Sequence, residues 1–436
     1  MNIRSSITDF VYSMILKCCI NMDQNLRIKF INITVFFMVL FTWLSRSIIP
    51  IPGNVLYFAS FLLTFTLVIL ANDGTFGEIK IDRCYFVLFI LFLLSFLIAA
   101  LAEARLGTIM QVVVYLIAFP LISIMINTED KQIMIINSFF NSVIINFYMI
   151  WILSVLLTDA HHQPQYSGFI DNPNSFAIFG TTVFIGCIYK IYNGSKFGWL
   201  GLGICCMLIF IIQSRTALLC VIVNAIIIFI FSIKYRLYRI VTIKRIVIAI
   251  LGAVIVWISV FSLSPISQKL HDYVLSRSNY STEVWNEIEL KDRDFYRLKQ
   301  GIGDNYDFST GRKVIWEAYI KEINLLPHGD NEYPQVENKN LELSAHNTYI
   351  HLAYCFGFFS GILYLLFNLY TGFLSTKLLF NKKMPKRISV ILFMVVLDYG
   401  IVTLVETVYS SLNMTICLSY WLLSYAVLFS DVYRKE

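Results

Sequence analysis

Twelve apolar segments run through this chain of 436 residues, and one polar stretch, Ser264–Ala345, interrupts them. Each segment approaches the length of about twenty residues that a helix needs to cross a hydrocarbon layer of about 30 Å. In that layer a backbone can satisfy its hydrogen bonds only as helices or as a closed barrel. The pattern therefore predicts an all-α membrane protein of about twelve transmembrane helices with one large helical loop outside the bilayer.

The composition agrees with a helical bundle in lipid. Hydrophobic residues make up 58% of the chain and charged residues 14%, with a mean hydropathy of +0.69. Soluble domains carry nearer a quarter charged residues and could not bury this apolar surface. The expected spans are 30–45, 54–71, 84–101, 107–126, 133–157, 174–192, 197–213, 216–233, 245–263, 346–371, 387–407 and 413–430.

The lysines and arginines set the expected orientation, because short cytoplasmic loops are enriched in them. Of the 34 basic residues, 21 fall on one side, three fall in the short loops of the other side, and ten lie in the large loop. Both termini are therefore expected in the cytoplasm, with the large loop facing outward. The net charge of +6 arises from this asymmetry, so it does not indicate nucleic-acid binding.

The same pattern divides the chain into five parts. In the N-terminal part, Ile7, Val11 and Cys18 recur at helical spacing and predict an interfacial helix, with a disordered tail as the alternative. No cleavable signal peptide is expected. The parts are a cytoplasmic segment (1–29), nine spans (30–263), the outer loop (264–345), three spans (346–430) and a cytoplasmic tail (431–436).

The large loop is expected to fold into two or three amphipathic helices. Apolar residues share one helical face over 266–274 and another over 315–323. The second helix is expected to start near Ser309–Thr310 and to end before Pro327. The loop carries fourteen acidic and ten basic residues, so it is not a general anion-binding surface.

The nine cysteines do not indicate a metal or disulfide framework. None lies in the large loop and no CxxC pair occurs, so they are expected to act as small buried hydrophobic residues. The spacing of five between His346 and His351 misaligns the two rings as zinc ligands, and no third ligand is apparent. We therefore predict no metal site.

Arg215 lies in a very tight outward turn after Gln213 and Ser214. An ionisable group at the border of a span is a functional hypothesis by default. A guanidinium there could bind a phosphate with two parallel hydrogen bonds. Alternatively, the side chain extends to the lipid headgroups.

Arg312 and Lys313 lie at an expected helix start. Cations oppose the helix dipole at that end, so a nearby negative group is expected to offset them. A bound anionic ligand is one candidate, because helix N-termini attract phosphate. A local salt bridge or a solvated basic pair is the alternative.

His346 and Asn347 mark the point where the large loop re-enters the membrane, with Tyr349 just beyond. An imidazole titrates near neutral pH, which suits a general base. The alternative is a boundary histidine that is hydrogen-bonded to a neighbour.

Two further polar motifs lie near the outer ends of spans. Asn172 and Asn174 flank Pro173 and could bind sugar hydroxyls, or Asn172 could cap the next helix. Glu406 is placed to orient an arginine or a histidine, whereas the deeper Asp398 is expected to be structural.

Taken in order, these motifs resemble the family of bacterial O-antigen polymerases and O-antigen ligases. The resemblance covers residues of about 165–430. The chain departs from the family pattern in one respect: no second histidine directly precedes His346, and His328 is eighteen residues upstream. The matching motifs are Gly168–Phe169 with Asn172–Asn174, Gln213–Leu218, Thr310–Arg312 with Trp316, His346–Tyr349 with Gly357, and Glu406.

The resemblance implies a GT-C-like, metal-independent glycosyltransferase without a cofactor, in the bacterial inner membrane. Its donor and acceptor would be undecaprenyl-diphosphate-linked saccharides, with membrane lipid, a chain-length regulator and a flippase as candidate partners. It implies catalytic roles for Arg215, Arg312 and His346, which are expected to converge. The residues expected to bind substrate are Asn172, Asn174, Ser214, Lys313, Asn347, Tyr349 and Glu406.

Three functional alternatives remain beside an O-antigen polymerase. An O-antigen ligase shares the chemistry and differs in the acceptor, and a capsule or exopolysaccharide polymerase is a close variant. A lipid-linked saccharide flippase belongs to a different class, but transporters often show internal repeats and charged midplane residues, and the polar candidates here gather at one face. The Phe-, Ile-, Tyr- and Asn-rich composition favours the polymerase.

Overall fold

Helices account for nearly all of the described structure, a computed structural model of the chain. The predicted N-terminal interfacial helix, the predicted helix over 266–274 and the first residues of the Thr310–Arg312 motif lie outside the described residues. The structure describes residues 22–49, 51–77, 81–158, 166–170, 172–234, 242–263, 312–328, 333–336, 339–340 and 344–429.

Within these residues, ten helices are long and apolar enough to cross a membrane. Two shorter apolar helices, α9 (Lys196–Ile212) and α18 (Thr415–Leu423) with its π-helical end η6 (Ser424–Leu428), complete the bundle and confirm an all-α polytopic membrane protein. The long helices are α2 (Gln24–Leu44), α3 (Gly53–Ala71), α4 (Arg83–Ala102), α5 (Leu106–Val113) continued by η3 (Val114–Ala118) and α6 (Phe119–Met125), α7 (Glu129–Leu157), α8 (Pro173–Tyr192), α10 (Arg215–Lys234), α11 (Ile243–Ser262), α16 (Phe358–Leu379) and α17 (Lys386–Val405).

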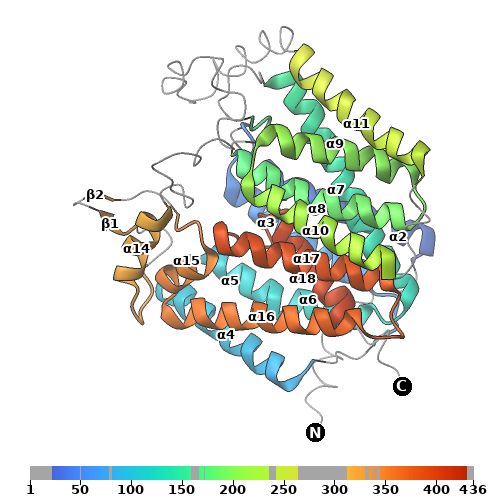
Figure 1. Cartoon of the computed structure of the whole chain (residues 1–436). Coiled ribbons are helices and arrows are strands. Elements are labelled where there is room, and N and C mark those ends of the chain that lie inside the picture. Colours follow the sequence, from blue (N-terminus) through green and yellow to red (C-terminus); the bar gives the residue numbers. More distant parts are fainter. Residues whose placement is uncertain are drawn as a thin grey trace.

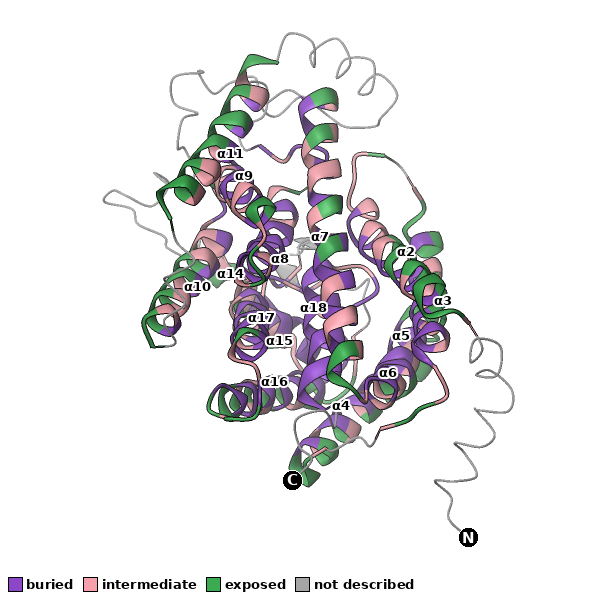
Figure 2. Cartoon of the chain, turned by 90° about the vertical axis from the view of Figure 1, so that its right-hand side faces the viewer, coloured by how far each residue is buried: buried purple, intermediate pink, exposed green. Residues whose placement is uncertain are grey.

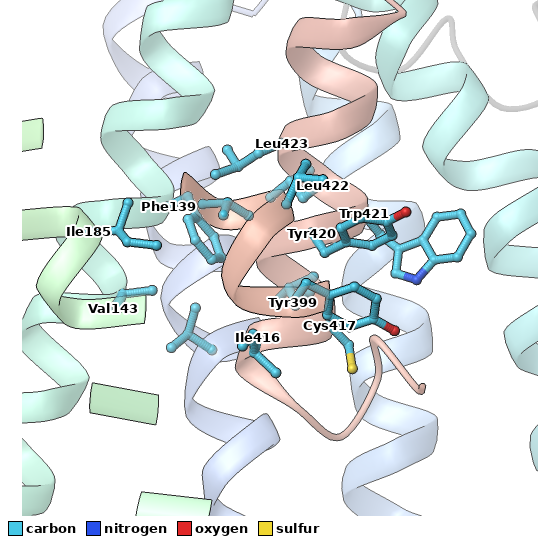
Figure 3. Close-up of a cluster of buried hydrophobic side chains, with 14 of the residues drawn as sticks. Phe139, Val143, Ile185, Tyr399, Ile416, Cys417, Tyr420, Trp421, Leu422 and Leu423 are labelled. Atoms are coloured by element: carbon cyan, nitrogen blue, oxygen red, sulfur yellow. The ribbon is translucent and has the colours of Figure 1, made fainter. Parts of the chain in front are cut away.

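The centre of the bundle is α18 and η6, in which every residue from Thr415 to Leu428 is buried. Figure 2 shows this element surrounded by α7, α8 and α17. Aromatic side chains fill much of the space around it: Trp421 stacks on Tyr115 with ring centroids 3.9 Å apart, and Tyr420 stacks on Tyr399 at 4.1 Å. Apolar side chains of α7 and α8 approach α18 from another side (Figure 3).

The helices at the edge of the bundle show the opposite pattern of exposure. Most apolar side chains of α10 and α11 face outward, including Phe229, Ile250 and Trp257. In water such a surface would be unstable, whereas lipid tails solvate it. The arrangement therefore places polar chemistry inside the bundle or at its ends.

The expected span over 346–371 is divided. A short helix, α15 (Thr348–Cys355), ends at Phe356, and the spanning helix α16 begins after Gly357. Gly357 has a φ of +89°, and a Cβ atom there would lie 2.7 Å from the carbonyl oxygen of Leu325. Only glycine meets both conditions without strain, so the prediction of one continuous helix was wrong at this point.

Helix α14 (Arg312–Glu322) lies against α15 at one end of the bundle (Figure 1). Tyr319 of α14 is fully buried and meets Tyr354 edge to face at 4.9 Å, while Trp316 Nε1 donates a hydrogen bond to the Ala345 carbonyl. The helix predicted over 315–323 is thus observed, and we call this end of the bundle the α14 end. Two short strands, β1 (Gln335–Val336) and β2 (Lys339–Asn340), form an antiparallel pair in the same loop.

Candidate functional site

A cavity of about 310 Å³ opens at the α14 end of the bundle. Its volume is at the lower limit of small-molecule sites, which occupy about 300–1,000 Å³. The end of α2, the start of α8, the residues before and within α15, and the loop between α17 and α18 form its wall. The lining residues include Thr42, Trp43, Arg46, Asn172, Asn174, Phe179, His346, His351, Glu406, Thr407, Tyr409 and Asn413.

The carboxylate of Glu406 joins three polar side chains at this cavity. Its Oε1 accepts hydrogen bonds from Arg312 Nη2 at 2.8 Å and from Asn174 Nδ2 at 3.1 Å, and its Oε2 lies 3.0 Å from His346 Nδ1. Glu406 ends α17, where the backbone becomes extended, and its side chain is only 11% exposed. A partly buried carboxylate needs hydrogen-bond donors, and the charged donor among these three is Arg312.

His346 reaches the cavity through an unusual backbone conformation. Its φ is +46°, in the left-handed region that non-glycine residues rarely adopt. Ala345 before it is bonded by Trp316, and Asn347 after it begins α15, so the backbone is held on both sides. If Nδ1 donates to Glu406, the neutral ring keeps its acceptor lone pair on Nε2, the nitrogen required of a general base.

Arg312 is the first residue of α14, and its guanidinium forms an ion pair with Glu406. The negative group expected beside this cation is therefore the Glu406 side chain at the end of α17. Of the interpretations drawn from the sequence, the structure contains the local salt bridge. Lys313 is exposed beside it and does not line the cavity.

Asn172 and Asn174 have distinct positions at the start of α8. Asn172 is the N-cap, and its Oδ1 accepts a hydrogen bond from the Asn174 backbone nitrogen at 2.8 Å. The Asn174 side chain lies between Glu406 and Ser214, whose Oγ is 3.4 Å from Asn174 Oδ1. Both asparagines line the cavity, so capping and substrate binding are compatible.

Arg215 begins α10 directly after the predicted tight turn. Gln213 adopts the left-handed conformation at the end of α9, with a φ of +58°. Ser214 is buried and connects to Asn174, which places Arg215 one residue from the polar cluster. Among the described residues, however, its guanidinium makes no hydrogen bond or ion pair with Glu406 or His346, and it does not line the cavity.

Asn347 and Tyr349 hold α15 in place. Asn347 Oδ1 caps α15 by accepting from the backbone nitrogens of Tyr349 and Ile350, and its Nδ2 donates to the Leu404 carbonyl. The Tyr349 hydroxyl lies 2.9 Å from Thr403 Oγ1 of α17. Neither residue lines the cavity. Their predicted contact with substrate would require a ligand that extends beyond it.

Two further histidines lie near the site. His351 lines the cavity but is buried; burial, with a smaller contribution from the charge of Arg105, lowers its pKa to about 4. It is therefore neutral at physiological pH. His328 stacks on Tyr354 at 4.3 Å and does not line the cavity. No group of three His, Cys, Asp or Glu side chains in the described ranges could hold a metal ion.

Several lining residues were not predicted from the sequence. Trp43 and Arg46 come from the end of α2, and Tyr409 and Asn413 come from the loop after Glu406. Arg46 was visible as one of three basic residues in the short outer loops. Its position beside Asn174 and Glu406 depends on helix packing.

Comparison with known proteins identifies the central part of the chain. Residues 182–365 match the family model described as O-antigen ligase, which confirms the family resemblance drawn from the motifs. No curated protein sequence matches the chain. The matched region contains Arg215, Arg312 and His346, whereas Asn174 and Glu406 lie outside it.

Proposed function

We propose that this chain, which carries a domain of the O-antigen ligase family, is an O-antigen polymerase that joins undecaprenyl-diphosphate-linked repeat units. The contact of Glu406 with both Arg312 and His346 at the wall of one cavity is the observation that supports this proposal most directly. It brings a cation, a candidate base and an orienting carboxylate together.

In the proposed reaction a hydroxyl of the acceptor sugar attacks C1 of the donor sugar. A new oxygen–carbon bond forms as the bond between C1 and the diphosphate oxygen breaks, and undecaprenyl diphosphate leaves. The acceptor proton passes to His346 Nε2. Direct displacement inverts the configuration at C1. Diphosphate is a good leaving group, so the proposed step requires no metal.

The Glu406 carboxylate has two tasks in this scheme. It orients the His346 ring through Nδ1, at 3.0 Å, and it stabilises the imidazolium that forms when Nε2 takes the proton. It also holds Arg312 at the site. General base catalysis of this kind contributes about 10²–10⁴-fold.

Arg312 and Arg215 are proposed to stabilise the negative charge that develops on the departing diphosphate. Preorganised cations at such a position contribute several kcal/mol. Arg215 begins a helix one residue from the polar cluster, so it would lie near a diphosphate that extends from the cavity toward α10. The exposed Lys313 would contribute charge at the entrance.

The charge asymmetry of the loops supports a location in the bacterial inner membrane with both termini in the cytoplasm. The α14 end, with the cavity, would then face the periplasm. Glu406 and the candidate cations gather at that end and not midway along the spans, which favours an enzyme over a flippase.

The decisive experiment uses the purified protein in nanodiscs with one defined lipid-linked repeat unit. A ladder of glycan lengths is expected, together with release of undecaprenyl diphosphate. Transfer only to lipid A–core would indicate the ligase instead. Transport of the lipid-linked saccharide without any new glycosidic bond would contradict the proposal.

A further inference from the structure

Arg46 lies on the cavity wall although it comes from the turn directly after α2 and lies outside the region matched by the family model. Its backbone nitrogen donates to the Trp43 carbonyl in the turn that ends α2. The next residues pair with the segment that leads into α8: Ser47 forms an isolated bridge with Ile170, and the Ile48 nitrogen donates to the Phe169 carbonyl. This pairing fixes Arg46 beside the start of α8.

The charges around the cavity distinguish Arg46 from the other cations. Among the described lining residues, Arg46 is the one arginine or lysine and Glu406 is the one carboxylate. Glu406 already accepts from Arg312 and lies against His346. Among the ion pairs and side-chain hydrogen bonds between described residues, none involves the Arg46 guanidinium, whereas Arg312 is paired with Glu406.

Two polar atoms on the same wall also lack partners. Thr407 Oγ1 and Asn413 Oδ1 are buried and make no hydrogen bond with any other described residue. Both residues line the cavity, between Glu406 and the start of α18. A buried polar atom without a partner is destabilising, so such atoms point to a ligand that supplies the missing contacts.

We propose that Arg46 binds a phosphate-class oxyanion inside the cavity, and that Thr407 and Asn413 bind hydroxyl groups of the sugar attached to it. This assignment rests on the proposed function. The donor diphosphate would contact Arg46 in addition to Arg312 and Arg215 of the matched region. A guanidinium suits the task, because its planar donors match two phosphate oxygens. The α2 end then forms part of the substrate site.

Binding of undecaprenyl diphosphate to the purified full chain tests this assignment without relying on turnover. The Arg46→Gln variant should weaken binding by at least about tenfold, the usual effect of losing a charge-assisted hydrogen bond. Arg46→Lys should restore part of the affinity, because it keeps the charge and loses the planar fork. Lys321→Gln removes an exposed cation of the same end of the bundle and serves as the matched control.

Competition by inorganic pyrophosphate, which lacks the lipid tail, forms a further arm of the test. Competition by pyrophosphate that disappears in Arg46→Gln supports oxyanion binding at this residue, whereas equal competition in both proteins overturns it. Thr407→Val and Asn413→Ala should weaken binding of a lipid-linked sugar more than binding of undecaprenyl diphosphate. Equal losses for both ligands would overturn the assignment of hydroxyl contacts.

The outcomes separate this proposal from the proposed function. If Arg46→Gln loses diphosphate binding but the wild-type protein forms no glycan from defined substrates, the Arg46 site stands and the polymerase assignment fails. If the wild-type protein forms a ladder and Arg46→Gln keeps wild-type affinity, kcat and KM, the polymerase stands and the Arg46 site is wrong. Thermal unfolding of each variant verifies that the chain is folded.

Discussion

Glu406 ends the spanning helix α17 and His346 lies just before the short helix α15, yet the His346 Nδ1 atom lies 3.0 Å from the Glu406 carboxylate. Thr348 secures this pairing, because its hydroxyl donates to the Glu406 carbonyl at 2.8 Å and accepts from the Val408 nitrogen. The backbone of the two segments is therefore fixed before any substrate arrives. A carboxylate and an imidazole held in this way form the unit on which the proposed chemistry depends.

The Glu406→Gln substitution should reduce turnover by about 10²-fold or more. The amide keeps the shape but cannot stabilise the imidazolium, and it loses the ion pair with Arg312. Single-turnover rates with a lipid-linked donor measure the effect. Glu317→Gln removes an exposed carboxylate of α14 and should leave the rate within about twofold of wild type. A Glu406→Gln rate equal to that control would contradict the role of this carboxylate.

Replacing His346 by alanine should reduce turnover by about 10²–10⁴-fold, because the hydroxyl proton then has no positioned acceptor. His351 lines the same cavity, but its pKa of about 4 makes it a weak base. The His351→Gln variant should therefore retain the shape of the pH–rate profile. A wild-type rate in His346→Ala would remove this residue from the mechanism, and loss of the acidic limb of the pH–rate profile in His351→Gln would transfer the role of base to His351.

The free energy of unfolding should fall as the pH is lowered from about 6.5 toward 4, because His351 titrates at a lower pH in the folded protein than in the unfolded chain. Its pKa is about 4 in the folded protein and 6.5 as an ordinary histidine, so the unfolded state binds the proton first. The stabilisation is fully present above about pH 6.5 and is lost progressively toward pH 4, by about 3 kcal/mol at most. Thermal unfolding in detergent at pH 7.5 and pH 5 measures the change.

The control for this prediction is the same measurement on His351→Gln, which removes the titrating group. His351→Gln should flatten the pH dependence of Tm relative to wild type. An unchanged pH dependence in His351→Gln would mean that other groups govern acid unfolding.

Hydropathy was sufficient to predict the helical class, because the length and composition of each span match the thickness and apolar character of a bilayer. Loop charge served to predict the orientation. His346 and Glu406 could also be identified as candidates, since each is ionisable at the border of a span. Arg312 could be identified because a cation at an expected helix start needs a negative group nearby. Arg46 could not be distinguished from an ordinary interfacial arginine, because its role depends on the pairing of Ser47 with Ile170, far apart in sequence. The division of the span at Gly357 depends on a similar contact, with Leu325.

The Gly357→Ala substitution should destabilise the protein by about 1–3 kcal/mol. The new Cβ atom would lie 2.7 Å from the Leu325 carbonyl oxygen, on a backbone with a φ of +89°, so both contact and conformation oppose it. Gly372→Ala in α16 is the matched control: nothing lies within 4 Å of its Cβ position, and alanine favours a helix by about 1 kcal/mol. The Tm should therefore fall for Gly357→Ala and stay level or rise for Gly372→Ala. Because Gly357 sets the angle between α15 and α16, the Gly357→Ala variant should also lose turnover at temperatures where it remains folded, and full activity there would show that the position of α15 tolerates the change.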